Sequence, residues 1–225
     1  MRHDKDIERI NEDDEDREKV RKPGNFSHDR GALLHVGEVM ESKPQVISSY
    51  ERFTGRVFTV RTDELVFEDG GPARVDVVEH RGSYAVIATP SENSVVLVRQ
   101  YRHPAGRSLW EIPAGTAEPG EGTLEGALRE LAEETGYRAA SARGIGSLYV
   151  TPGFCDEVMH FVHADGLSPG EPNFDEDERI VVQNFTIDEM MQLVRNGEIA
   201  DAKTLLALLW LRGPRSELAP SSADN

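Results

Sequence analysis

Three glutamates stand close together in the run Arg129–Tyr137, where Glu130, Glu133 and Glu134 occupy positions i, i+3 and i+4. On a helix these positions fall within about 100° of one another, because each residue turns the chain by ~100°. Three carboxylates at this spacing repel one another unless a strong positive charge lies between them. A hard divalent cation with oxygen ligands supplies such a charge, and Mg²⁺ in particular couples carboxylates to substrate phosphates. The spacing therefore predicts a metal site on one side of a short helix.

The helix that must carry these glutamates has its own start and stop signals. Thr123 is a suitable N-cap, and Gly136 lies where a left-handed residue would end the helix. Gly126 in the helix interior costs roughly 1 kcal/mol relative to alanine, which indicates close packing at that position. We expect one apolar stripe to pack on the core and the glutamates to be presented on another face. The stripe, at i, i+3, i+4 and i+7, consists of Leu124, Ala127, Leu128 and Leu131.

The same segment resembles the signature of the Nudix hydrolases, whose box reads G-x5-E-x7-R-E-U-x-E-E-x-G-U, with U an apolar residue. Leu131 fills the first apolar position, and Tyr137 fills the last, a mild departure from the pattern. A solvated acidic helix face is the alternative for a lone Glu-x-x-Glu-Glu, but a full match at fixed spacing favours the box. The fixed positions are Gly115, Glu121, Arg129, Glu130, Glu133, Glu134 and Gly136. The resemblance implies the Nudix fold, an α/β/α sandwich around a mixed sheet.

Flanking segments resemble one group within this family, the ADP-ribose and nucleoside-diphosphate-sugar pyrophosphatases. The segments are Val98–Arg102, Trp110–Gly115, Thr151–Glu157, and Asn196–Ile199 followed by Asp201–Thr204. They imply hydrolysis of the pyrophosphate bond of a nucleoside diphosphate linked to another moiety. ADP-ribose, giving AMP and ribose 5-phosphate, is the first choice, and GDP-mannose or another sugar nucleotide is the alternative. A non-catalytic Nudix sensor that binds a nucleotide is a further alternative, but such members typically lose box carboxylates, and all are present here.

The resemblance also implies a divalent metal, Mg²⁺ or Mn²⁺. Its expected ligands are Glu130, Glu133 and Glu134 of the box. Ala114 precedes the box glycine, so its carbonyl oxygen can be a further ligand while Gly115 allows the tight loop. The predicted metal ligands are therefore Ala114, Glu130, Glu133 and Glu134, and the three glutamates are also predicted to be catalytic.

The catalytic base is expected in the acidic run Asp175–Glu178, which resembles the base-carrying loop of some of these enzymes. The register within this run is open; Glu176 is favoured as the base, with Glu178 nearer the metals. A solvated hairpin loop is the alternative interpretation, since charge runs are usually solvated. In the family the box arginine, here Arg129, pairs with the residue matching Glu121 and orients a metal-binding glutamate.

Four further residues are predicted to bind substrate: Arg102, Glu111, Gly153 and Glu157. Arg102 can bridge phosphate oxygens with its planar guanidinium, although a surface arginine beside a strand is an equal alternative. Glu111 and Trp110 face opposite sides of an extended segment, so one can reach the site while the other packs in the core. Gly153 and Glu157 lie in a loop, where binding residues collect, but Glu157 can also be a plain turn residue.

The composition excludes several classes of function. A formal net charge of −16 argues against a nucleic-acid-binding surface, which needs a basic patch, and requires local arginines and cations to attract a polyphosphate. Cys155 is the single cysteine, so no intrachain disulfide can form and a reducing compartment is expected. The sequence shows no signal peptide and no membrane span. We expect a cytoplasmic protein with a small-molecule nucleotide substrate and no nucleic acid or membrane partner.

The chain is predicted to have four parts. Residues 1–45 form a charged, flexible extension, and 214–225 form a flexible tail. Residues 46–78 form a small antiparallel β unit that makes a homodimer, and 79–213 form the Nudix hydrolase domain. Strands are predicted at Arg56–Arg61, Arg74–Glu79, Tyr84–Thr89, Ser94–Tyr101, Ser147–Val150, Val158–His163 and Ile180–Phe185, and the later helices at Ile187–Val194 and Lys203–Leu211.

Overall fold

The computed structural model of the protein describes residues 43–174, 179–215 and 218. It contains, in chain order, the elements β1 (Gln45–Thr54), β2 (Phe58–Val66), β3 (Pro72–His80), β4 (Ser83–Thr89), β5 (Ser94–Arg102), a 3₁₀ turn (His103–Ala105), β6 (Arg107–Glu111), β7 (Ala114–Thr116), α1 (Thr123–Thr135), β8 (Ser141–Tyr149), β9 (Val158–Asp165), β10 (Val181–Thr186), α2 (Ile187–Arg195) and α3 (Ala202–Arg212).

Two sheets make up the central layer. The first is mixed and has the order β7-β4-β9-β8, in which β4 and β9 are parallel and the other neighbours are antiparallel. The second is antiparallel and has the order β10-β5-β6, and its strand β5 contacts β4 of the first sheet. Every residue of β4 is buried. A strand of this kind must be covered on both faces.

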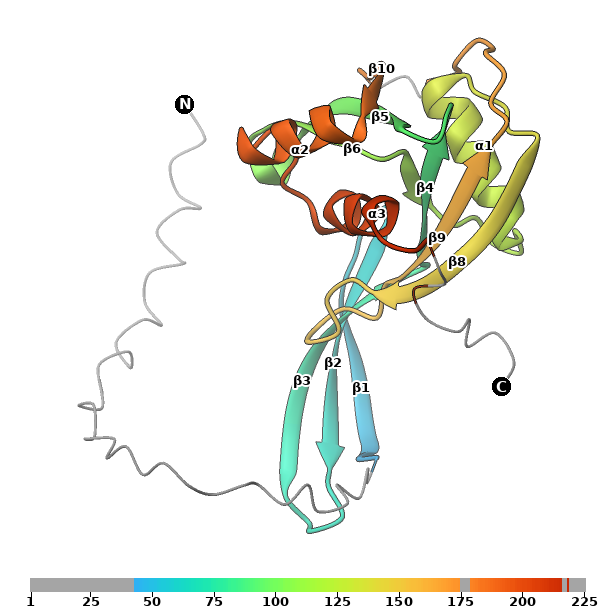
Figure 1. Ribbon diagram of the computed structural model, residues 1–225. Coiled ribbons are helices and arrows are strands. Elements are labelled where there is room, and N and C mark those ends of the chain that lie inside the picture. Colours follow the sequence, from blue (N-terminus) through green and yellow to red (C-terminus); the bar gives the residue numbers. More distant parts are fainter. Residues whose placement is uncertain (1–42, 175–178, 216–217, 219–225) are drawn as a thin grey trace, which may run out of the picture. The chain divides into compact units, whose positions relative to one another are not determined.

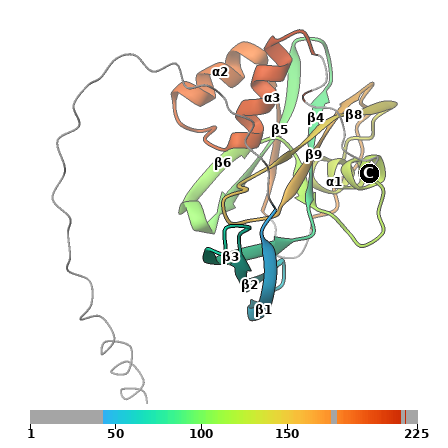
Figure 2. The same ribbon diagram turned by 90° about the horizontal axis from the view of Figure 1, so that it is seen from below.

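Helices cover the central layer on both sides. Alternate residues of β4 belong to different hydrophobic clusters, because successive side chains of a strand point to opposite faces. Ile87 packs in the cluster that contains Met190 of α2 and Leu208 of α3, whereas Val86 packs in the cluster that contains Leu131 of α1. Helices α2 and α3 therefore lie on one face and α1 on the other (Figures 1 and 2). This arrangement confirms the predicted α/β/α sandwich around a mixed sheet.

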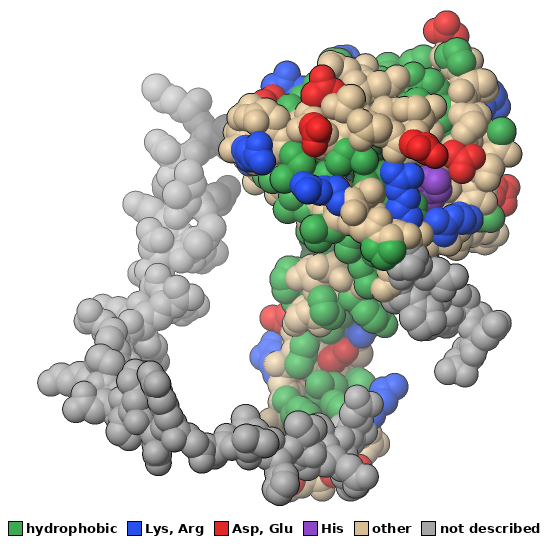
Figure 3. Space-filling model, in the orientation of Figure 1, with side chains coloured by type: hydrophobic (Ala, Val, Ile, Leu, Met, Phe, Trp, Pro, Cys, Tyr) green, Lys and Arg blue, Asp and Glu red, His purple; other side chains and the backbone are tan. Residues whose placement is uncertain are grey.

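Strands β1, β2 and β3 form a separate antiparallel sheet in that order, as the predicted small β unit requires. Polar side chains are paired with one another on this sheet: Asp63 accepts hydrogen bonds from Ser49 at 2.7 Å and from Arg61 at 3.0 Å. Large hydrophobic side chains are exposed on it, and Figure 3 shows such side chains along its length. The exposed residues are Val46, Ile47, Tyr50, Phe53 and Phe58 of the strands and Phe67 of the following turn.

Most predicted elements are confirmed, but several differ in extent: β2 runs on to Val66 beyond the predicted Arg61, and β8 begins at Ser141 instead of Ser147. Strand β1 was not predicted as a strand, because two register shifts interrupt its pairing with β2 and blur the period-two pattern. Strands β6 and β7 are short and were read only as an extended segment. Helix α1 begins one residue away from the expected cap: Gly122 is the N-cap, and Thr123 is the first helical residue. Gly136 ends α1 with φ 75°, as predicted.

Among the described residues, the helices are all too short or too polar to cross a membrane.

Candidate active site

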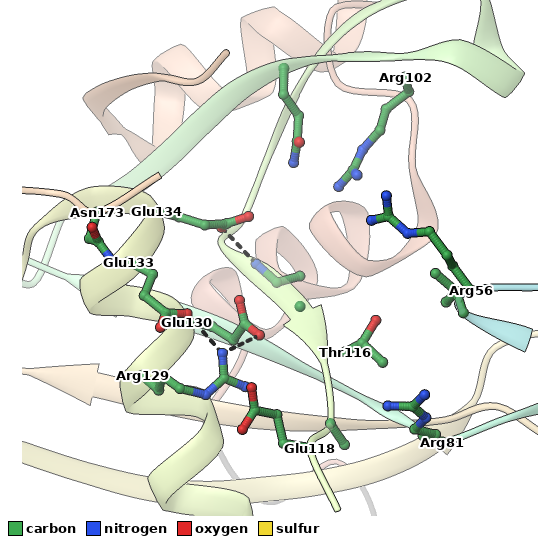
Figure 4. A pocket seen from close by; sticks show the side chains of 15 residues that line it. Arg56, Arg81, Arg102, Thr116, Glu118, Arg129, Glu130, Glu133, Glu134 and Asn173 are labelled. Atoms are coloured by element: carbon green, nitrogen blue, oxygen red, sulfur yellow. Dashed lines mark hydrogen bonds and ion pairs between the residues drawn. The ribbon is translucent and has the colours of Figure 1, made fainter. Parts of the chain in front are cut away.

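A cavity of about 620 Å³ brings together segments that are far apart in the sequence (Figure 4). Its walls come from the turn between β1 and β2, the connection between β3 and β4, the end of β5, strand β7 and helix α1. The lining residues are Arg56, Val57, Arg81, Gln100, Arg102, Ala114, Gly115, Thr116, Ala117, Glu118, Arg129, Glu130, Glu133, Glu134 and Asn173. Arginines and glutamates are equal in number in this lining, so the cavity is locally balanced although the whole chain carries a net charge of −16.

Helix α1 supplies the glutamate wall of the cavity. All three predicted metal-binding glutamates of the helix line it, but their environments differ. Glu134 is only 4% exposed, and its Oε2 accepts a hydrogen bond from the backbone N–H of Ala114 at 3.0 Å. The side chains of Glu130 and Glu133 are 13% and 40% exposed, respectively. The wall therefore offers one buried, fixed carboxylate and two more accessible ones.

The predicted apolar stripe of α1 packs on the core except at its first residue: Ala127 and Leu131 are fully buried, and Leu128 packs against the same cluster. Leu124, which was expected in the core, is 44% exposed, whereas Leu131 and Glu134 are both buried. At Gly126 an added Cβ would lie 2.1 Å from the Tyr84 ring, so the helix rests directly on β4 there. The prediction of close packing at Gly126 is confirmed. The prediction that every glutamate lies on an exposed face is wrong for Glu134, because the helix contacts the sheet through the side that carries it.

Arg129 organises the carboxylates around it. Its Nε and Nη2 donate to the two oxygens of Glu121 at 2.7 and 3.0 Å, and its Nη1 donates to Glu130 at 2.9 Å and to Glu133 at 2.8 Å. The hydrogen bond from Arg129 holds the pKa of Glu121 below its ordinary value, and Glu121 in turn raises the pKa of Arg129. The expected pairing of the box arginine with Glu121 is confirmed, and the same guanidinium restrains two of the cavity glutamates.

Strand β7 presses against the glutamate wall at the box glycine. A Cβ added to Gly115 would lie 2.0 Å from Cδ of Glu130 and 2.1 Å from each of its carboxylate oxygens. Only glycine leaves room for this carboxylate, which explains the residue type at this position without any need for a special backbone angle. The predicted ligands Ala114, Glu130 and Glu134 thus lie at one junction between β7 and α1.

The donor set of this junction fits a hard divalent cation. Carboxylate and backbone carbonyl oxygens are the ligands that Mg²⁺ and Mn²⁺ prefer. Across residues 43–174, 179–215 and 218, no group of three or more His, Cys, Asp or Glu side chains is arranged to hold a metal ion by itself. Mg²⁺ keeps several waters and takes substrate phosphates as ligands, so substrate would complete its coordination here.

Three arginines form the wall opposite the glutamates. Figure 4 shows Arg56, Arg81 and Arg102 directed toward the glutamate wall from the other side of the cavity. Arg102 was predicted to bind substrate, whereas Arg56 and Arg81 were missed. Their sequence signal is weak, since each is simply an arginine beside a glycine in a connection between strands. Three guanidinium groups facing three carboxylates make the cavity suited to an anion whose charge is shared between arginines and a metal.

Glu111 lies behind the arginine wall and does not line the cavity. Its side chain is only 2% exposed, and its two oxygens accept hydrogen bonds from Nε and Nη2 of Arg102 at 3.0 and 2.9 Å. Lys203 also donates to it. Burial opposes ionisation of Glu111, but the hydrogen bonds and charges of Arg102 and Lys203 outweigh burial and lower its pKa. The carboxylate expected to contact substrate is therefore engaged by Arg102 and Lys203. Trp110 is buried in the core, as anticipated for one of the two neighbours.

Gly153 and Glu157, which were predicted to bind substrate, also lie outside the cavity lining. Glu157 accepts a hydrogen bond from Ser83 at 2.7 Å. The loop between them is attached to the end of β3: Val78 donates to the Phe154 carbonyl at 2.7 Å, and Asp156 accepts from the His80 N–H at 2.7 Å. These contacts support the connection that carries Arg81, so the loop contributes to the site through that connection.

Glu176 and Glu178 lie outside the described residues, so their predicted roles remain predictions. The chain leading to them is anchored at the glutamate wall. Asn173 lines the cavity, and its N–H donates to the carbonyl of Glu133 at 2.9 Å. A Cβ added to Gly136 would lie 2.4 Å from the carbonyl oxygen of Gly170, which shows how tightly this segment packs on the end of α1.

The sequence of this chain matches a family model and is similar to the sequences of known proteins. The family model described as NUDIX domain matches residues 79–208. A methanol dehydrogenase activator of Bacillus methanolicus is 39% identical over 179 residues, which cover 79% of this chain and 96% of that protein. An ADP-ribose pyrophosphatase of Bacillus subtilis (strain 168) is 37% identical over 170 residues, which cover 75% of this chain and 92% of that protein.

A solved structure supports the fold. The crystal structure of an ADP compounds hydrolase matches with a TM-score of 0.67 and 24% sequence identity, covering 76% of this chain and 92% of that chain. The family match spans the whole central layer with its three helices up to Leu208, and Glu130, Glu133 and Glu134 of the box line one cavity of this fold. The chain therefore belongs to the Nudix family and is a Nudix pyrophosphohydrolase.

Proposed function

We propose that the protein hydrolyses ADP-ribose to AMP and ribose 5-phosphate with the help of a divalent metal, Mg²⁺ or Mn²⁺. The observation that carries this proposal is the two-sided cavity, in which glutamates of α1 face Arg56, Arg81 and Arg102. A diphosphate bridged between a metal and arginines fits such a cavity, because each wall neutralises part of its charge. The relative named as an ADP-ribose pyrophosphatase supports the choice of substrate.

The glutamates of α1, Ala114 and the arginines of the cavity have proposed parts in the reaction. Glu130, Glu133 and Glu134 hold the metal with the carbonyl oxygen of Ala114, and Arg129 keeps Glu130 and Glu133 in place. When bound, the metal neutralises phosphate charge and lowers the pKa of a water molecule. The arginines grip the phosphate oxygens with paired N–H groups, which fixes the diphosphate against the glutamate wall.

The proposed base is Glu176 or Glu178. The attachment of Asn173 to the Glu133 carbonyl supports this proposal, because the acidic run begins two residues further along the chain. The base takes a proton from the attacking water, water oxygen bonds to one phosphorus, and the bridging oxygen leaves with the other phosphate. One water is consumed, and two monophosphates are released.

We propose that the protein acts as a homodimer through the sheet β1-β2-β3. Exposed apolar side chains support this assembly, because a small three-stranded sheet cannot bury both of its faces within one subunit. Phe53 and Phe58, whose ring centroids are 6.1 Å apart, are 56% and 42% exposed. The single cysteine supports a cytoplasmic location, where thiols stay reduced.

The proposal is tested by incubating the protein with ADP-ribose, GDP-mannose and other sugar nucleotides, with and without Mg²⁺ or Mn²⁺, and measuring the products. We expect metal-dependent release of AMP and ribose 5-phosphate, with the highest kcat/KM for ADP-ribose. Glu130→Gln is the matched control, since it removes the charge of one proposed ligand while keeping its shape. A higher kcat/KM for GDP-mannose would make GDP-mannose the preferred substrate. Tight nucleotide binding without any product would identify a non-catalytic sensor.

A further inference from the structure

The guanidinium of Arg102 is held by one edge. Its Nε and Nη2 donate to the two oxygens of Glu111 at 3.0 and 2.9 Å, a bidentate contact that uses the buried side of the group. The Arg102 side chain is 40% exposed and lines the cavity, whereas Glu111 is 2% exposed. The Nη1 group takes no part in the contact with Glu111. The contact therefore orients the remaining N–H groups of Arg102 for a ligand in the cavity.

Glu111 is itself held from behind by Lys203. The ammonium group of Lys203 donates to Oε2 of Glu111 and, at 2.9 Å, to Oδ1 of Asp201. Lys203 is 13% exposed and does not line the cavity, so it cannot contact a ligand there directly. The four groups form a row of alternating charges that begins at the cavity with Arg102 and ends at Asp201.

The far end of this row is fixed to rigid structure. Asp201 is the N-cap of α3, and its Oδ1 accepts the N–H of Thr204 at 3.1 Å. Thr204 in turn accepts the N–H of Ile112, the residue after β6, at 3.0 Å. The start of α3 is thereby tied to the end of β6, which carries Glu111. Because both ends are attached to packed elements, the ammonium group of Lys203 has a defined position behind Glu111.

Arg102 also has a competing attraction. Glu134, on the opposite wall, carries a negative charge and lines the same cavity. A guanidinium that turned toward Glu134 would neutralise a proposed metal ligand and leave the arginine wall. Lys203 fixes the Glu111 carboxylate from behind, and that carboxylate holds Arg102 on its own wall.

We propose that Lys203 is a positioning residue: through Glu111, it holds Arg102 in the orientation that binds the diphosphate. The inference rests on the proposed binding of a diphosphate in this cavity. It makes the first turn of α3, which carries Lys203, a determinant of substrate affinity, although Lys203 does not line the cavity.

The test measures binding of inorganic diphosphate by calorimetry in the presence of a chelator, together with KM and kcat for ADP-ribose at saturating Mg²⁺. We expect Lys203→Met to weaken diphosphate binding and raise KM by about tenfold, the effect of one charge-assisted hydrogen bond, with kcat changed far less. Lys203→Arg should restore both values to near wild type. Lys43→Met, at an exposed lysine, is the control for loss of a positive charge and should leave both unchanged.

A double-mutant cycle separates positioning from general support of the fold. In the Arg102→Ala background, Lys203→Met should weaken diphosphate binding no further, because its partner is already gone. An equal loss from Lys203→Met in both backgrounds, or unchanged binding in the single variant, would overturn the inference. If circular dichroism shows that Lys203→Met does not fold, Lys203→Gln is used in its place.

The two proposals can fail separately. A wild-type protein whose diphosphate binding depends on Arg102 and, through Glu111, on Lys203, but which hydrolyses no sugar nucleotide, would refute the proposed function and leave this inference intact. A wild-type protein that binds no diphosphate would overturn this inference.

Discussion

Replacing Gly115 with alanine should separate activity from stability. Gly115 lies in β7, and its backbone is not left-handed, so alanine fits the main chain without strain. The added Cβ would lie 2.0 Å from Cδ of Glu130, which is too close for any pair of carbon atoms. The obstructing group is the end of a flexible side chain, so the Glu130 carboxylate must move away while the backbone stays in place.

The cost in stability should be small. Moving Glu130 breaks its 2.9 Å ion pair with Arg129, whose side chain is 25% exposed. Arg129 keeps its hydrogen bonds to Glu121 and Glu133, and the displaced carboxylate moves into the cavity, so the loss should be about 1 kcal/mol, the upper end for solvent-accessible pairs. Replacing glycine by alanine in a compatible backbone stabilises the folded protein by about 0.4–1 kcal/mol, because it lowers the conformational entropy of the unfolded chain. The free energy of unfolding should therefore stay within about 1 kcal/mol of wild type.

The cost in activity should be large. A metal ligand contributes several kcal/mol of charge stabilisation in the transition state, and each ~1.4 kcal/mol changes the rate tenfold. Displacing Glu130 should lower kcat/KM for ADP-ribose by about 100-fold or more. Gly144→Ala is the matched control, since an added Cβ at that exposed strand position meets no atom within 4 Å.

The measurements are kcat/KM over a range of Mg²⁺ concentrations and the free energy of unfolding in urea. Near-normal kcat/KM in Gly115→Ala would refute the reasoning, because it would mean that the Glu130 carboxylate is not needed where it lies. A large loss of stability would also contradict it, since the backbone of β7 would then have moved instead of the side chain.

Three further predictions follow from other parts of the structure. Gly126→Ala should destabilise the protein by about 1–3 kcal/mol in urea denaturation, because the added Cβ would lie 2.1 Å from the buried ring of Tyr84. This loss should exceed the gain of about 1 kcal/mol that alanine brings as the better helix former. A stabilised variant would show that the helix can move off β4. Glu134→Gln should lower kcat by about 100-fold with little change in thermal unfolding, since the amide oxygen can still accept the Ala114 N–H; normal kcat at saturating Mg²⁺ would remove Glu134 from the proposed ligands. Burial lowers the pKa of His160 below its ordinary 6.5, so His160 takes up a proton at higher pH in the unfolded chain than in the folded protein. The contribution of neutral His160 to stability is therefore complete above about pH 6.5 and is lost as the pH falls through the lowered pKa. His160→Asn should therefore show a flatter decline of unfolding free energy between about pH 7 and 5, and an unchanged slope would assign the decline to other groups.

The sequence by itself determined the family and the chemistry of the glutamate wall. The spacing of Glu130, Glu133 and Glu134 is local, and a helix with a known period converts such spacing directly into a shared surface. The same local logic correctly placed the end of α1 at Gly136 and the close packing at Gly126. The α/β/α layers followed from the resemblance that these residues carry.

Only the tertiary structure decided what faces that wall. Arg56, Arg81 and Arg102 come from three separate strand connections or ends, and no local pattern relates them. The contact of Glu111 with Lys203 joins residues 92 positions apart. The burial of Glu134 depends on which side of α1 rests on β4, where Gly126 approaches Tyr84 closely and Ala127 and Leu131 pack in the core. Periodicity describes one element at a time, whereas the arginine wall, the row of charges behind it and the exposure of each glutamate depend on how several elements pack together.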